Sequence, residues 1–135
     1  MRILLRLIAY AWPMPWTLFG ITTGLVLGAR FQRVEGVIEI HGPWVAHLLA
    51  RMPRPAMAMT MGHVVFGRDP LTLEITRKHE RVHVRQYERW GVAFVPAYLG
   101  CAALLYLRGR DGYRENPFEI EAYKVDRPDF TERGA

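Results

Sequence analysis

The sequence predicts a mainly helical α+β fold, in which an apolar helix comes first and one long polar helix packs on a small antiparallel sheet. Three observations predict this fold. Residues 1–29 are strongly apolar, residues 30–67 contain two strand-like stretches, and residues 69–91 have the periodicity and end signals of a long helix. We expect residues 1–29 to form a membrane-anchor or signal-like segment, residues 30–125 one domain, and residues 126–135 a polar tail.

The first segment contains two apolar stretches separated by a pair of prolines, and its total length is sufficient to cross a bilayer. Trp12 and Trp16 are of the residue type that gathers at the membrane–water boundary. We therefore predict a membrane anchor over residues 1–29. A signal peptide cut after Ala29 and a buried core helix are the two alternatives.

Two stretches after the apolar segment are typical of strands. Residues 33–41 alternate in polarity and contain β-branched side chains, and residues 57–67 centre on a Val-Val-Phe run. Residues 44–51 between them favour a short helix. A small antiparallel sheet beside the long helix is the simplest arrangement, and its free edge could hold an extended peptide as an added strand.

The long helix is predicted from its end signals and from its periodicity. Asp69 suits the cap position, Pro70 the first helical position and Gly91 the end. One face has the spacing of a core-facing stripe, so we expect the two histidines on it to point inward; the stripe consists of His79, Val82, His83, Gln86 and Trp90. Buried imidazoles need partners, and a metal ion is the partner that this spacing suits best.

Residues 79–83 read His-Glu-Arg-Val-His, which is the pattern HExxH. Residues four apart share one helix face, so His79 and His83 can bind the same metal ion. Glu80 lies beside them and could act as general base on a metal-bound water, which is the arrangement that zinc peptidases use. The pattern therefore predicts a catalytic zinc site.

A third protein ligand is expected downstream, because catalytic zinc sites usually have three. Asn116 and Pro117 suit the cap and first position of another helix. Glu119 and Glu121 follow them two residues apart and on nearly opposite helix faces, so only one of them can complete the site. Glu119 could instead reach back to the cap, and Glu121 could be a solvated charge.

Residues 91–107 form a second apolar run, near the lower length limit for a spanning helix. A full crossing would separate His79 and His83 from a ligand beyond residue 107. The metal site therefore favours a buried, re-entrant or interfacial helix for this run.

The net charge of +5 and the pI near 9.8 suit an anionic surface. No aromatic-and-basic nucleic-acid motif is present, so we expect no nucleic-acid partner. Cys101 is the single cysteine, which excludes an internal disulfide.

Two motifs together, HERVH and NPFEIEA, resemble the gluzincin metallopeptidases, in which a glutamate from a later helix joins HExxH. The chain is more closely similar to small uncharacterised bacterial proteins that are membrane-associated or carry signal peptides. The shared motifs are a GRDPL turn, an HExxHVxQYE helix, an FxPAY run and a closing NPFExEA, which stand here at residues 67–71, 79–88, 94–98 and 116–122.

In membrane gluzincins the ligand glutamate is commonly followed three residues later by alanine and then aspartate. Glu119 fits this pattern through Ala122, whereas Tyr123 stands in place of the aspartate. The resemblance implies that residues 30–125 are a zinc metallopeptidase-like domain with zinc on His79, His83 and Glu119. It also implies a peptide or protein substrate and a location at the bacterial inner membrane.

Several roles stay open at this stage. Gln86 could support a metal ligand, and the oxyanion of the reaction could be stabilised by any of four side chains: His63, Tyr87, Tyr113 or Tyr123. One alternative function is a non-catalytic zinc-binding membrane protein that keeps the same fold, and another is a basic binder of anionic lipid. The alternative location is secreted or periplasmic, after signal cleavage.

Overall fold

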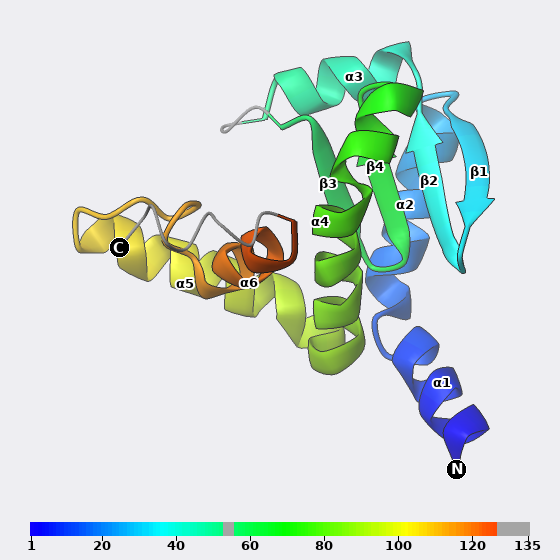
Figure 1. Cartoon of the computed structure of the whole chain (residues 1–135). Helices are drawn as coiled ribbons and strands as arrows, with labels where there is room; N and C mark the ends of the chain where they lie inside the picture. The colour runs from blue at the N-terminus through cyan, green and yellow to red at the C-terminus, as the bar shows by residue number, and fades with distance from the viewer. Residues whose placement is uncertain (53–55, 127–135) are drawn as a thin grey trace.

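A four-stranded sheet stands between the N-terminal helices and a long helix, α4, on its other face (Figure 1). The structure is a computed structural model and describes residues 1–52 and 56–126. The helices are α1 (Arg2–Ala11), α2 (Met14–Val26), α3 (Pro43–Ala50), α4 (Pro70–Trp90), α5 (Phe94–Leu107) and α6 (Pro117–Asp126), with a 3-10 turn, η1 (Gly91–Ala93). The strands are β1 (Arg30–Val34), β2 (Val37–His41), β3 (Ala58–Met61) and β4 (Val64–Gly67).

The mainly helical α+β fold is therefore confirmed, as is the packing of the HExxH helix on a small sheet. The predicted polar tail lies outside the described residues, apart from the end of α6 at Asp126.

The sheet differs from the expected antiparallel one because it is mixed. Its order is β1-β2-β4-β3, and β2 runs parallel to β4 with Ile38 opposite Val64. The other two pairs, β1 with β2 and β3 with β4, are antiparallel. Helix α3 connects the two antiparallel pairs, and this crossover brings β4 beside β2 in the same direction, as parallel pairing requires.

Each of the two predicted strands is in fact a hairpin. Residues 33–41 turn at Glu35 and Gly36, and residues 57–67 turn at Gly62. All three turn residues have positive φ, at 51°, 81° and 63° respectively, a conformation that glycine adopts at no steric cost. The alternating pattern continued through both turns, so the pattern alone did not separate the strands.

Two apolar clusters cover the two faces of the sheet. Helices α2 and α3 pack on one face, where the buried side chains are Ile40, Val45, Leu49, Val64 and Phe66. Helix α4 packs on the other, where they are Val37, Val65, Leu73 and Val84. Successive side chains of β4 thus point to opposite faces of the sheet, as the two-residue period of a strand requires.

The N-terminal apolar segment forms two helices, which meet at Trp12 and Pro13. Helix α2 buries the small residues Thr17, Gly20 and Gly24 against the sheet, whereas α1 buries none of its residues. In Figure 1, the N-terminal end of α1 extends away from the sheet, whereas its C-terminal end contacts α4.

The helical run Pro70–Leu107 contains a window that is long and apolar enough to cross a membrane, by length and composition only, and 11% of this window is buried. This finding is compatible with membrane association. At Gly91 the chain turns between α4 and α5 with φ at 59°. The apolar part, α5, therefore extends about 21 Å at 1.5 Å per residue, which is shorter than the ~30 Å hydrocarbon core.

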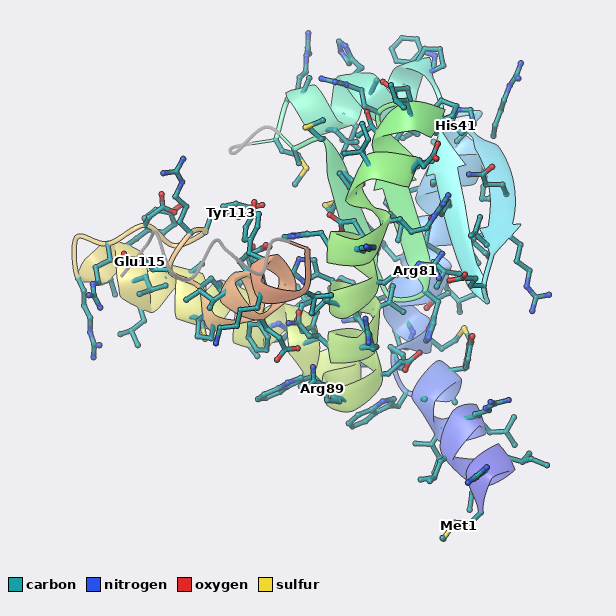
Figure 2. The ribbon with its side chains drawn as sticks, in the orientation of Figure 1. Met1, His41, Arg81, Arg89, Tyr113 and Glu115 are labelled. Carbon is teal, nitrogen blue, oxygen red and sulfur yellow. The ribbon has the colours of Figure 1, made fainter. Side chains whose placement is uncertain are left out.

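A buried carboxylate joins α4 to the sheet. Glu39 on β2 is 1% exposed and accepts two hydrogen bonds from Arg77, at 2.9 and 3.0 Å. Arg81 lies 3.4 Å from the same carboxylate and donates to the carbonyl of Val34 at 2.7 Å, and Figure 2 shows Arg81 reaching from α4 toward the sheet. Burial raises the pKa of Glu39, but Arg77 and Arg81 outweigh it and the pKa is lowered.

Replacing Glu39 with Gln should destabilise the fold by roughly 2–3 kcal/mol, because it leaves Arg77 and Arg81 without their carboxylate. Urea unfolding measures this change, and Glu74→Gln, on the exposed side of α4, is the control with no expected effect. The difference between wild type and Glu39→Gln should be complete above the unfolded pKa near 4.5 and disappear as the pH falls through the lower folded pKa. A difference that persists at low pH would contradict this assignment.

Candidate metal centre

Three buried side chains from two helices meet where α6 packs on α4. His79 and His83 lie one turn apart on α4, and Glu119 lies in the first turn of α6. The Nε2 atom of His79 is 3.0 Å from Oε2 of Glu119, and Nε2 of His83 is 3.2 Å from Oε1 of the same carboxylate. The three side chains therefore converge on a single point between the helices.

This group could hold a metal ion. One possible ligand atom from each residue lies within 4.8 Å of the others, and all three residues are buried. A tetrahedral ion with ligands at about 2.0–2.1 Å separates neighbouring ligand atoms by roughly 3.3 Å, so small side-chain adjustments would seat it. Two imidazoles and one carboxylate are also a donor set that divalent transition metals accept.

The start of α6 explains which glutamate faces the site. Asn116 is fully buried, and its side chain accepts a hydrogen bond from the amide of Phe118 and donates to the carbonyl of Tyr98. This cap fixes the first turn, so the carboxylate of Glu119 points at the histidines rather than back at the cap. Glu121 is not part of this group: its carboxylate pairs with Arg89 and accepts a hydrogen bond of 3.3 Å from the amide nitrogen of Gln86.

Gln86 and Tyr98 hold two of the ligands in place. The Nδ1 atom of His83 lies 2.8 Å from the amide oxygen of Gln86, which leaves Nε2 directed at the site. Gln86 in turn donates from its amide nitrogen to the carbonyl of Phe118 on α6. The hydroxyl of Tyr98 donates to Oε1 of Glu119 at 2.8 Å. Such contacts orient ligands and raise metal affinity.

Glu80 is buried beside the three ligands and is not one of them. Its Oε2 atom accepts a hydrogen bond of 2.6 Å from the hydroxyl of Thr60 on β3. Glu80 directly follows the ligand His79 on α4, and its negative charge contributes to raising the pKa of His83. The edge strand β3 therefore fixes the carboxylate that the sequence predicts to be the general base.

The four candidate oxyanion donors separate into two groups. Tyr113 and Tyr123 lie at the site, where their hydroxyls are 2.9 Å apart and the ring of Tyr123 packs on His79 at 4.5 Å between centroids. Burial and the charges of Glu119 and Glu80 raise the pKa of Tyr113, and Figure 2 shows this residue next to α6. The other two have hydrogen-bond partners outside the group of ligands. Tyr87 donates to the carbonyl of Thr60, and His63 is hydrogen-bonded to Glu88.

Burial and the neighbouring charges shift the pKa values of His83 and Glu119 in opposite directions. Burial alone would lower the pKa of His83, but the hydrogen bond to Glu119 and the charges of Glu80 and Glu119 raise it to about 9. Burial would likewise raise the pKa of Glu119, whereas its bonds to His79 and His83 lower it to about 2. A proton on His83 therefore occupies the place that a metal ion would take.

Sequence reasoning missed the roles of Thr60 and Tyr98. Both are brought to the site from elements that no spacing rule connects with HExxH. Tyr98 belongs to the FxPAY run and so stood within a recognised motif, but Thr60 lies in a methionine-rich strand with no local signal.

Comparisons with known proteins found no relative of this chain. No family model matches the chain, and neither the curated proteins nor the solved structures contain a match.

We expect about one bound metal ion per chain in the purified protein, and a sharp loss of it in Glu119→Ala. The loss in affinity should exceed the roughly 100-fold that removal of a supporting residue causes, because a ligand itself is removed. Glu74→Ala, an exposed substitution on α4, is the control and should keep its metal. Elemental analysis of both variants beside the wild type measures this, and equal metal in the two variants would contradict the assignment of Glu119.

Metal affinity should rise by about tenfold per pH unit between pH 6 and pH 8, since the metal displaces one proton from His83, whose metal-free pKa is about 9. Competition with a chelator of known affinity measures the slope. A pH-independent affinity would show that no proton is displaced.

Proposed function

We propose that this protein is a zinc-dependent metallopeptidase that hydrolyses a peptide bond with Glu80 as general base. The observation that carries the proposal is the buried group of His79, His83 and Glu119 with a second buried carboxylate, Glu80, beside it. Three protein ligands and an adjacent base form the arrangement that catalytic zinc sites use, because the fourth metal position is left for water or substrate.

Zinc is the metal that this donor set suits best. Two imidazole nitrogens and one carboxylate oxygen are typical of zinc hydrolases, and the spacing of His79 and His83 on one helix is theirs as well. A zinc ion held here would supply Lewis-acid chemistry, by lowering the pKa of a water molecule and polarising a carbonyl group.

The protein's own residues would carry the proton and hold the substrate. Glu80 would accept a proton from the attacking water and deliver it to the leaving amine. The hydrogen bond from Thr60 holds one oxygen of Glu80 and leaves the other for this transfer. Tyr113, at the site and kept protonated by burial, could donate to the oxyanion that forms as the carbonyl is attacked.

The position of β3 supports a peptide as the substrate. This strand is at one edge of the sheet, and Thr60 at its centre is the residue that contacts Glu80. A peptide bound as an added strand along β3 would pass beside Glu80 and the metal ligands. Main-chain hydrogen bonds to an edge strand bind peptides of many sequences, which suits a protease.

We also propose that the protein acts at the bacterial inner membrane. The apolar helices α1, α2 and α5 support this location, because all three expose large aliphatic side chains. The resemblance of the sequence motifs to small bacterial membrane-associated proteins points the same way.

Replacing Glu80 with Gln should lower peptide hydrolysis by at least about 1,000-fold and leave one zinc per chain, because the substitution removes the base but no ligand. Hydrolysis of a mixed peptide library, followed by mass spectrometry, measures the activity, and elemental analysis measures the zinc.

Glu74→Gln, an exposed substitution on the same helix, is the control and should keep full activity. A zinc-loaded wild-type protein that cleaves no peptide in the library would favour the alternative, a non-catalytic zinc-binding membrane protein.

A further inference from the structure

Helix α1 is folded against the protein at one end only and exposes its large aliphatic side chains. None of its residues is buried, and the exposed fraction is 76% for Ile3, 60% for Leu4 and 63% for Leu7. Single exposed apolar residues are ordinary, but a contiguous group of them on one helix marks an interaction surface. The partner of α1 must therefore offer an apolar environment.

The polar residues of α1 lie together on the opposite side of the helix. Arg2 and Arg6 are four residues apart and share one face, whereas Leu4, Leu7 and Ile8 are turned away from that face by the 3.6-residue period. A short helix with basic residues on one side and aliphatic residues on the other is typical of helices that lie at a bilayer surface.

The two charged side chains of α1 itself are both basic. Four arginines (Arg2, Arg6, Arg30 and Arg33) precede the first acidic residue of the sequence, Glu35. Basic residues beside an apolar helix face complement the headgroups of anionic lipids. A second copy of the chain fits less well, because a two-fold contact through this surface would bring like charges together.

The length and attachment of α1 decide how it would meet a bilayer. Its ten residues extend about 15 Å, half of the ~30 Å hydrocarbon core, so it cannot cross. Its far end is fixed, since Tyr10 donates to the carbonyl of Gly36 at 3.1 Å and the indole of Trp12 donates to the carbonyl of Glu88 at 2.6 Å. Figure 2 shows Met1 at the free tip of the helix.

We propose that α1 is an interfacial anchor for an anionic lipid bilayer and that it holds the metal centre close to the membrane surface. Trp12 is bonded to Glu88, which lies five residues beyond His83, or about 7.5 Å along the axis of α4. The inference rests on the proposed membrane location and names the surface and the lipid class responsible for it. The metal-binding proposal does not depend on it.

The test is flotation of the full-length, metal-loaded protein with lipid vesicles. Vesicles with about one third phosphatidylglycerol should bind the wild type, and neutral phosphatidylcholine vesicles should bind it at least tenfold less. Arg2→Gln with Arg6→Gln should lower the partition coefficient on anionic vesicles about 25-fold, from about fivefold for each charge. Arg2→Lys with Arg6→Lys should restore it.

The matched control is Arg51→Gln with Arg68→Gln, which removes two exposed arginines that adjoin α3 and the start of α4, at the end of the molecule away from α1 (Figure 1). This control should bind anionic vesicles as the wild type does. A further variant, Leu4→Glu with Leu7→Glu, should abolish binding, and every variant should retain its metal, which shows that it is folded.

Two results would overturn the inference. Equal binding to neutral and anionic vesicles, unchanged by the substitutions in α1, would leave the membrane location standing and exclude α1 as its anchor. The second result is that the protein binds no vesicle, and that it self-associates in sedimentation unless α1 is substituted. This result would assign the surface to a second copy of the chain, and it would also contradict the membrane location.

Discussion

Polar side chains buried on both faces of α4 are the constraint on which the rest of the structure depends. On the side of the sheet, Arg77 and Arg81 require the carboxylate of Glu39, which fixes how α4 crosses β2. On the other side, His79 and His83 require the carboxylate of Glu119, which fixes α6. Buried charges without partners cost several kcal/mol, so each of these contacts also excludes alternative packings of the helix.

The local features of the site could be predicted from the sequence because their geometry is set within one helix turn. The spacing of His79 and His83, the start of α4 at Asp69 and the start of α6 at Asn116 all follow from short-range rules. The parallel pairing of β2 with β4 follows no such rule, since it depends on where α3 returns the chain. The contact of Thr60 with Glu80 depends on how α4 packs on the hairpin of β3 and β4, which no short-range rule predicts either.

The choice between Glu119 and Glu121 could be predicted only in part, because it depends on both a short-range rule and the packing of two helices. The helix period placed the two residues on different faces, but only the packing of α6 on α4 decides which face is inward. Once Asn116 fixes the first turn, Glu119 meets the histidines and Glu121 meets Arg89 at the surface. Ala122, fully buried one turn after Glu119, lets the two helices approach closely. The packing of α6 on α4 is therefore a sufficient reason for a small residue at this position.

The departure at Tyr123 also has a physical reading. An aspartate at that position could orient a histidine by a charged hydrogen bond, whereas the ring of Tyr123 packs edge-on against His79 and its hydroxyl meets that of Tyr113. The tyrosine therefore restrains His79 by contact without adding a negative charge. Glu80 and Glu119 already place two carboxylates in this small volume. A third carboxylate would raise the electrostatic repulsion among them, and a neutral residue at this position avoids it.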